Sequence, residues 1–165
     1  MPITPIVDPA DYDPSAIVVP IEALRRANPQ RGNFEQLNGL LALDLARQVA
    51  VGVYRVPDEP FWAPDHMPGH PLLPGVLMLD ALAQLGGYYT YAAGGVGEGR
   101  LFGWSGLEQV TFRRAVRPGQ TVIYAARCLE LRSRRARFHG QGFVDGHCVV
   151  DAIVVGMPFA DPGAR

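Results

Sequence analysis

The residues of this sequence that could perform chemistry lie close together, in a proline-rich loop and in the apolar segment that follows it. The loop Asp65-His66-Met67-Pro68-Gly69-His70-Pro71 is stiff, because a residue before a proline is kept out of the α region. A stiff loop can hold an imidazole at a fixed angle, and histidine is the side chain that ordinarily acts as a base near neutral pH. We therefore expect His66 to be a base, with an ordinary exposed loop histidine as the alternative.

A carboxyl group follows inside the apolar segment. Between Gly75 and Ala93 the only strongly polar side chains besides Thr90 are Asp80 and Gln84. Their i, i+4 spacing places both on one face of a helix. An ionised carboxylate in a core is unfavourable unless it is paired, and such groups cluster at active sites, so Asp80 needs a partner or a function. The alternatives are that Asp80 caps a nearby loop and that Gln84 satisfies a backbone group.

The elements that would position these residues are one long helix and several strands. Pro74 and Gly75 at the start and Gly94-Gly95 at the end predict a helix over 75–93, which is apolar nearly all round and therefore buried. The segment 21–29 predicts a short helix. The turn signals and β-branched residues predict strands over 38–45, 47–56, 101–114, 121–132, 136–144 and 147–157. This pattern indicates an α+β fold, an antiparallel sheet wrapped around a single helix.

Length and composition indicate one domain over residues 1–165, with an extended arm at 1–15 and a loose tail at 160–165. The formal net charge of −1 does not indicate binding to nucleic acid or to an anionic membrane. The amino-terminal residues lack the pattern of a signal peptide, and no apolar run reaches the ~18 residues of a membrane span. We therefore expect a soluble, cytoplasmic protein. Cys128 and Cys148 form no disulfide framework.

A zinc site is the competing interpretation of the loop, with Asp65, His66 and His70 as ligands. Pro68 and Gly69 would break the helix that puts an i, i+4 histidine pair on one face, so no metal site is expected. The other histidines, His139 and His147, flank a strand turn and are expected to be exposed.

Two segments resemble one known family. The run His66-Met67-Pro68-Gly69-His70-Pro71-Leu72-Leu73-Pro74-Gly75, continued to Asp80-Ala81-Leu82-Ala83-Gln84, is similar to the signature of the β-hydroxyacyl-(acyl carrier protein) dehydratases of type II fatty-acid synthesis. The segment from Val110 to Gln120 resembles the strand and Val-x-Pro-Gly turn of the same family. The resemblance is strong over 61–84 and 101–120.

The resemblance implies a hot-dog fold, which agrees with the expected helix and sheet. It implies dehydration of (3R)-3-hydroxyacyl thioesters on an acyl carrier protein, without a cofactor, by a homodimer or a trimer of dimers. His66 of one chain would act as the base and face Asp80 of its partner, the acid, which would act directly or through a water molecule. The alternative is that His66 performs both proton transfers while Asp80 orients a water molecule. Gln84 would position the water molecule or Asp80. The backbone amides of Gly75 and Val76, at the positive end of the helix dipole, would bind the thioester oxygen.

Substrate contacts are expected from two further groups. The walls of an acyl tunnel would be Leu72, Leu73, Phe102 and Trp104, with core packing as the alternative for each. The acidic carrier protein would meet a basic patch, either Arg113, Arg114 and Arg117 or the second group Arg132, Arg134, Arg135 and Arg137, with a solvated hairpin face as the alternative.

The sequence departs from the family at three positions. Asp80 stands where one branch has glutamate, and the branch that also isomerises the double bond has aspartate. Asp65 replaces a glycine and places a second carboxylate beside the candidate base, and Met67 replaces phenylalanine. A hot-dog thioesterase and a non-catalytic acyl-binding protein are the two alternative functions.

Overall fold

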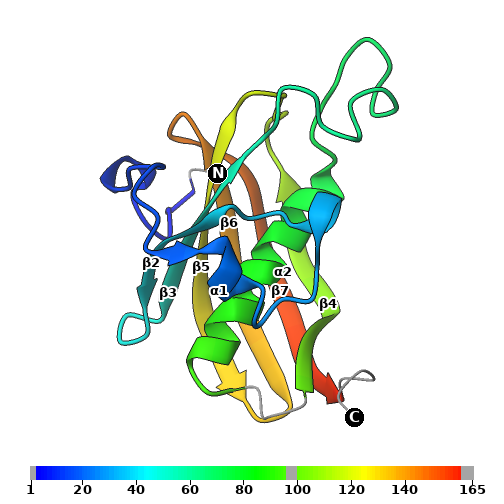
Figure 1. Cartoon of the computed structure of the whole chain (residues 1–165). Helices are drawn as coiled ribbons and strands as arrows, with labels where there is room; N and C mark the ends of the chain where they lie inside the picture. The colour runs from blue at the N-terminus through cyan, green and yellow to red at the C-terminus, as the bar shows by residue number, and fades with distance from the viewer. Residues whose placement is uncertain (1–2, 96–99, 161–165) are drawn as a thin grey trace.

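A long helix lies across one face of a seven-stranded antiparallel sheet in the computed structural model of the chain, which describes residues 3–95 and 100–160 (Figure 1). The strands follow the order β1-β2-β3-β5-β6-β7-β4. They are β1 (Val19–Pro20), β2 (Gly39–Asp44), β3 (Val49–Arg55), β4 (Arg100–Phe112), β5 (Thr121–Arg132), β6 (Arg135–Val144) and β7 (His147–Ala160). This arrangement confirms the hot-dog fold expected from the sequence.

The long helix, α2 (Gly75–Ala92), begins and ends where the sequence predicts. Pro74 precedes it in an extended conformation, and at the other end Gly94 takes a φ of +72°. The amide of Gly94 donates to the carbonyl of Tyr91, and the amide of Gly95 donates to that of Thr90. These two bonds form a Schellman motif, which only a residue tolerant of positive φ completes without strain.

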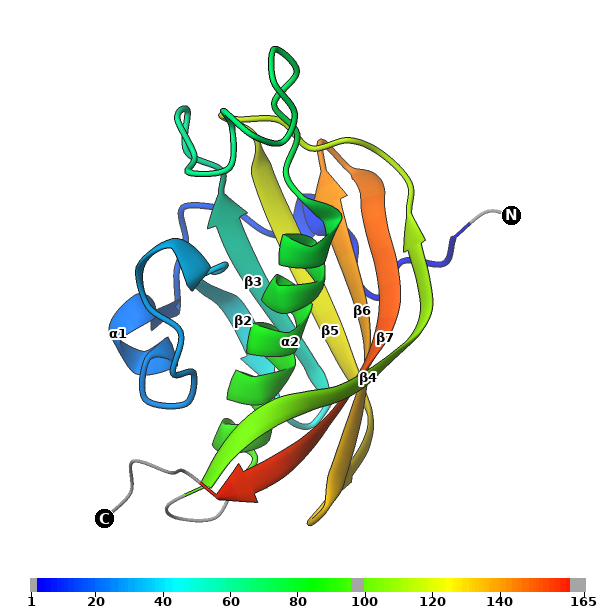
Figure 2. The same ribbon diagram turned by 90° about the vertical axis from the view of Figure 1, so that its right-hand side faces the viewer.

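The main core lies between α2 and the curved sheet (Figure 2). Leu82 and Leu85 are fully buried on the helix, and Phe138 reaches them from β6. The helix approaches the sheet closely because a glycine faces each large side chain. A Cβ at Gly86 would lie 2.8 Å from the ring of Phe138, and one at Gly140 would lie 2.8 Å from Leu82. Since interiors are close-packed, these glycines set how near α2 can sit to β6.

The amino-terminal arm covers the opposite face of the sheet. Ile6 is buried there in a second apolar cluster with Val51, Val53 and Phe143. Its amide donates to Oε1 of Gln141 over 2.8 Å, a bond between residues 135 positions apart in the chain. The expected arm is therefore held on the outer face of β3, β5 and β6 along the residues that the structure describes. Of the loose tail expected over 160–165, Ala160 is instead the last residue of β7, and 161–165 lie outside the described residues.

Three local expectations differ from the structure. The helix expected over 21–29 is only α1 (Ile21–Leu24), because the backbone bonds that follow mix three- and four-residue spacings and leave irregular turns. Strand β1 has two residues, too few for any periodic pattern to reveal. His139 is half-buried rather than exposed, since its Nε2 lies 3.3 Å from Oδ1 of Asp151 on the neighbouring strand. His147 is exposed, as expected.

Candidate active site

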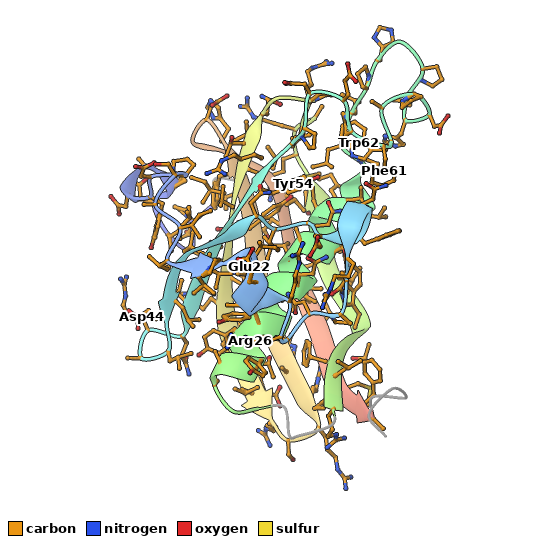
Figure 3. The ribbon with its side chains drawn as sticks, in the orientation of Figure 1. Glu22, Arg26, Asp44, Tyr54, Phe61 and Trp62 are labelled. Atoms are coloured by element: carbon orange, nitrogen blue, oxygen red, sulfur yellow. The ribbon has the colours of Figure 1, made fainter. Side chains whose placement is uncertain are left out.

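The loop that carries His66 connects β3 to α2 and is fixed at its two ends. The amide of Val56 donates to the carbonyl of Gln120, and the amide of Leu73 donates to that of Val116. Both bonds tie the loop to the turn between β4 and β5, while Trp62, buried near the first turn of α2, anchors its middle (Figure 3). Between these anchors the loop projects beyond the end of the sheet, so His66 is exposed.

His66 is held by three hydrogen bonds, just before the turn that Met67 and His70 close with two bonds to each other. Its amide donates to the carbonyl of Trp62 over 2.8 Å, and its carbonyl accepts from the amide of Leu72 over 2.9 Å. The ring nitrogen Nδ1 lies 2.8 Å from the carbonyl oxygen of Leu72. Because a carbonyl oxygen only accepts, Nδ1 carries a hydrogen, and Nε2 of the neutral ring keeps its lone pair. The ring is therefore oriented with its basic nitrogen available.

His66 lines an open, mainly apolar groove of about 600 Å³. Leu72, Leu73 and Phe112 line it, and so do Gly75 and Val76 at the start of α2. No side chain caps this end of the helix, so its first amides are free to bind an oxygen. Gly75 also leaves room for Phe112, because a Cβ there would lie 2.7 Å from that ring and the ring would have to move.

Asp80 lies on α2, half-buried, and contacts Gln84 one turn further along. Nε2 of Gln84 donates to Oδ2 of Asp80 over 2.6 Å. Burial raises the pKa of the Asp80 carboxyl, and the hydrogen bond from Gln84 opposes this with a smaller effect in the other direction. The net shift favours the neutral acid, because a carboxylate loses hydration in this position.

Gln84 connects Asp80 to the segment 28–36. Its Nε2 also donates to the carbonyl of Phe34 over 2.7 Å, and its Oε1 accepts from the amide of Gln36 over 3.1 Å. The side chain of Asn28 donates to the backbone carbonyl of Gln84 over 3.0 Å. Gln84 therefore satisfies backbone groups and holds Asp80 at once. The sequence reasoning missed Asn28, Phe34 and Gln36, and no local pattern marks them as neighbours of a helix some 50 residues away.

Within one chain, His66 and Asp80 do not belong to the same cluster. Among the described residues, the ring of His66 bonds to Leu72, Asp80 bonds to Gln84, and Asp80 does not line the groove of His66. The side chains expected to wall a tunnel are divided as well. Leu72 and Leu73 line the groove, whereas Phe102 packs on Phe138 and Trp104 lies half-exposed on β4.

The expected basic residues also separate into groups. Arg113 and Arg114 line the groove beside His66, and Arg117 is exposed in the following turn without lining it. The second group lies on the hairpin between β5 and β6, where it is largely paired: Arg132 with Glu130, and both Arg135 and Arg137 with Glu108. Only the first group therefore shares a surface with the candidate base.

Two further findings concern the described residues as a whole. No helix among them is long and apolar enough to cross a membrane. Within the ranges 3–95 and 100–160, histidine, cysteine and acidic side chains do not gather in any group of three that could hold a metal ion.

Comparisons with known proteins agree on one family. A family model described as a FabA-like domain matches residues 28–153. A 3-hydroxyacyl-[acyl-carrier-protein] dehydratase FabZ of Syntrophobacter fumaroxidans is 34% identical over 111 residues, which cover 67% of this chain and 75% of the relative.

Two solved structures show the same fold. The dehydratase heterocomplex ApeI:P of Xenorhabdus doucetiae has a TM-score of 0.67 at 16% identity, covering 81% of this chain and 89% of that one. A putative thioesterase of Ralstonia eutropha has a TM-score of 0.62 at 20% identity, covering 83% of this chain and 97% of that one. At these identities the structural likeness concerns the fold alone.

Proposed function

Because the chain belongs to the FabA-like family, we propose that it removes water from a 3-hydroxyacyl thioester carried on an acyl carrier protein, giving the trans-2-enoyl thioester of fatty-acid biosynthesis. The relatives named as 3-hydroxyacyl-[acyl-carrier-protein] dehydratases support this reaction. The observation that carries the proposal is the pair of groups: a histidine with a free basic nitrogen, and a carboxyl that burial keeps closer to neutral.

In the proposed reaction His66 and Asp80 move one proton each. Nε2 of His66 takes the proton from C2, the C2 electrons form the new double bond, and the C3–O bond breaks. Asp80 donates its proton to the departing hydroxyl, which leaves as water. The histidine is then protonated and the aspartate ionised, so a proton must return from one to the other before the next turnover. The raised pKa of Asp80 favours its protonated form at the start.

Charge that builds on the thioester oxygen would be stabilised at the start of α2. The amides of Gly75 and Val76 lie in the groove of His66, at the positive end of the helix dipole. Loss of one such donor typically reduces the rate by ~10²–10³-fold. The apolar walls formed by Leu72 and Leu73 would hold the substrate against these donors.

We assign each active site to two chains of a homodimer, because His66 and Asp80 lie in separate clusters of a single chain. Strand β4 is one of the two edge strands of the sheet, and it exposes Trp104, Leu107, Val110 and Phe112. An exposed apolar edge strand is suited to pairing with a copy of itself about a two-fold axis. Val76, which is 65% exposed at the start of α2, would be covered by the same contact. His66 of one chain would then act with Asp80 of its partner.

The carrier protein would dock beside the groove. Arg113 and Arg114 lie at its edge, and their positive charge is complementary to an acidic carrier. The variant with Arg113→Glu and Arg114→Glu should raise KM several-fold for a carrier-bound substrate. An uncharged N-acetylcysteamine thioester is the control, since its KM should not change. An equal effect on both substrates would contradict the proposed docking surface.

The reaction is tested by incubating the protein with trans-2-enoyl thioesters, on carrier protein and on coenzyme A, and following the loss of enoyl absorbance by hydration. His66→Ala and Asp80→Asn should each reduce the rate by ~10²–10⁴-fold. His70→Ala is the matched control, because His70 is an exposed histidine of the same loop. Release of free thiol instead of hydration would indicate a thioesterase, and no turnover by wild type would indicate a non-catalytic acyl-binding protein.

The shared site is tested by mixing the two inactive variants. Random exchange makes half of the dimers mixed, and each mixed dimer rebuilds one of its two sites with both His66 and Asp80. Activity should therefore recover to about a quarter of the wild-type value in a two-fold dimer. No recovery, although subunit exchange is verified by a tag on one variant, would show that each chain carries a complete site.

A further inference from the structure

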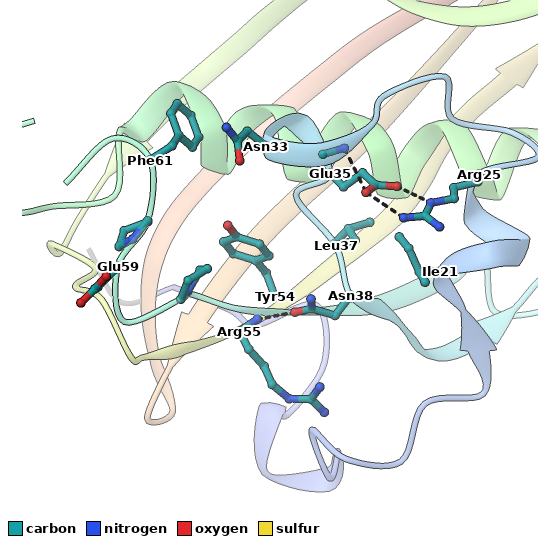
Figure 4. A pocket seen from close by; sticks show the side chains of 13 residues that line it. Ile21, Arg25, Asn33, Glu35, Leu37, Asn38, Tyr54, Arg55, Glu59 and Phe61 are labelled. Atoms are coloured by element: carbon teal, nitrogen blue, oxygen red, sulfur yellow. Dashed lines mark hydrogen bonds and ion pairs between the residues drawn. The ribbon is translucent and has the colours of Figure 1, made fainter. Parts of the chain in front are cut away.

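A second pocket, distinct from the groove of His66, lies between β3, the loop after it and the segment 32–38. We call it the Tyr54 pocket; its volume is about 390 Å³ (Figure 4). Its lining includes Arg25, Asn33, Glu35, Tyr54, Arg55, Glu59 and Phe61. Its size falls at the lower end of the range of small-molecule pockets, so it could accommodate a single ring.

The lining of the Tyr54 pocket is polar, and its charges balance: Arg25 and Glu35 form an ion pair, and Arg55 and Glu59 add one charge of each sign. Nε of Arg25 donates to Oε1 of Glu35 over 2.5 Å, and Nη2 donates to Oε2 over 3.0 Å, so the two charges neutralise each other. Asn33 adds an amide and Phe61 adds an aromatic face. Such a lining is suited to an uncharged planar group that carries a hydrogen-bonding function.

Tyr54 supplies the most specific indication of a ligand. Its side chain is 8% exposed, and its ring is directed toward the space between Phe61 and Asn33 (Figure 4). Among the hydrogen bonds of the described residues, the hydroxyl of Tyr54 has no protein partner, and it is not one of the fully buried unpaired atoms, so it is open to the pocket and can bond to water or to a ligand. Burial raises the pKa of Tyr54, so the hydroxyl keeps its proton and is available as a donor.

Contacts on the same chain connect this pocket to Asp80. Nε2 of Gln84 bonds both to the carboxyl of Asp80 and to the carbonyl of Phe34. The rings of Phe34 and Phe61 lie 6.4 Å apart, and they are 59% and 47% exposed. Gln84, Phe34 and Phe61 therefore form a series of contacts from the candidate acid to the lining of the Tyr54 pocket.

We propose that the Tyr54 pocket receives the far end of the acyl chain, and that the preferred substrate ends in a planar group with a hydrogen-bonding function, such as a phenol. This proposal rests on the dehydratase function proposed above. A saturated alkyl end would displace water from the hydroxyl of Tyr54 and the amide of Asn33 without replacing its hydrogen bonds. Sites built from buried polar groups reject analogues that leave those groups unpaired.

The experiment compares kcat/KM for three kinds of 3-hydroxyacyl N-acetylcysteamine thioester: alkyl-ended, phenyl-ended and 4-hydroxyphenyl-ended, with a series of linker lengths. Wild type should prefer the 4-hydroxyphenyl end to the alkyl end by about tenfold or more at the best linker length. Tyr54→Phe should lower this preference about five- to tenfold, and Asn33→Ala should lower it as well. With the phenyl-ended substrate, which has no hydroxyl to pair, Tyr54→Phe should not lower kcat/KM, because no hydrogen bond is lost, and should raise it if the ring displaces water from the Tyr54 hydroxyl.

Tyr91→Phe is the matched control, because Tyr91 is a half-exposed tyrosine at the carboxyl-terminal end of α2, outside the Tyr54 pocket. It should leave the preference unchanged. Equal kcat/KM for alkyl and 4-hydroxyphenyl ends in wild type would overturn the proposal and leave the dehydratase function standing. So would an equal loss of preference in Tyr91→Phe and Tyr54→Phe.

Measuring the affinity for a thioester tests the Tyr54 pocket independently of whether the protein catalyses dehydration. If no substrate is dehydrated, the proposed function fails, but calorimetry with a saturated 4-hydroxyphenyl-ended thioester still examines the pocket. Binding by wild type that Tyr54→Phe weakens about five- to tenfold would support the pocket as the site for the ring. Equal affinity in wild type and Tyr54→Phe, or no binding by either, would overturn it.

Discussion

Replacement of Gln84 by leucine removes three hydrogen bonds from the centre of the candidate site while nearly preserving the volume of the side chain. Gln84 is 4% exposed, and its polar atoms are all in use. Nε2 donates to Asp80 and to the carbonyl of Phe34, and Oε1 accepts from the amide of Gln36. The substitution therefore reports on how much this cluster contributes to folding and to the acidity of Asp80.

The expected loss of stability follows from the groups that remain. Gln36 is 1% exposed, so its amide would be left buried without a partner, which costs ~1–3 kcal/mol. Phe34 is largely exposed, and its carbonyl can bond to water instead, so its loss is smaller. The sum is a decrease of about 2–4 kcal/mol in the free energy of unfolding, reduced somewhat by the apolar character of leucine.

The same substitution should change the pH dependence of activity. The hydrogen bond from Gln84 lowers the pKa of Asp80 and partly opposes the effect of burial. Without that bond the pKa of Asp80 rises further. An acid is active while protonated, and its activity falls as the pH rises through its pKa, so this limb of the profile should move to higher pH.

Urea unfolding and the pH profile of kcat/KM measure the two effects. Thr90→Val is the matched control, because Thr90 is also buried on α2 but its Oγ1 donates only to the local carbonyl of Gly86 over 2.8 Å. Thr90→Val should lower the free energy of unfolding by less than ~1 kcal/mol and leave the pH profile of kcat/KM unchanged. A loss below ~0.5 kcal/mol for Gln84→Leu, which is the usual effect of a surface change, would refute the reasoning about stability. An unmoved limb would refute the link to Asp80.

Three further substitutions test other parts of the structure. Asp80→Asn should reduce the rate of hydration by ~10²–10⁴-fold yet stabilise the fold by ~0.5–2 kcal/mol. The gain should appear as the pH rises through the raised pKa of Asp80, since only the ionised carboxyl is penalised by burial, and a gain confined to low pH in melting scans would contradict this sign. Gly86→Ala gains about 1 kcal/mol of helix propensity but places a Cβ 2.8 Å from the buried ring of Phe138. Calorimetry should therefore show a net loss of ~1–2 kcal/mol in the free energy of unfolding, and an unchanged or higher Tm would mean that the core can rearrange around the new methyl group. Gln141→Leu leaves the buried amide of Ile6 unpaired and should lower the free energy of unfolding by ~1–3 kcal/mol. Hydrogen exchange at Ile6 should become faster, and unchanged exchange there would show that apolar contacts alone hold the arm.

The sequence by itself determined the elements whose causes are local. The helix from Gly75 to Ala92 is bounded by a proline and by glycines that sit beside it in the chain, and its apolar composition indicates burial wherever the sheet lies. The strands after residue 100 carry their own turn signals. His66 and Asp80 could likewise be chosen from the sequence, because a stiff loop and a carboxyl in an apolar helix are unusual at the level of residue types.

The tertiary structure decided the interactions between residues far apart in the chain. Gln84 bonds to the backbone of Phe34 and Gln36, which lie 50 and 48 residues away. A backbone amide or carbonyl has no sequence signature, because every residue except proline offers the same groups. The position of the arm and the pocket around Tyr54 depend in the same way on distant segments. Local propensity fixes which elements form, whereas their packing decides which side chains meet.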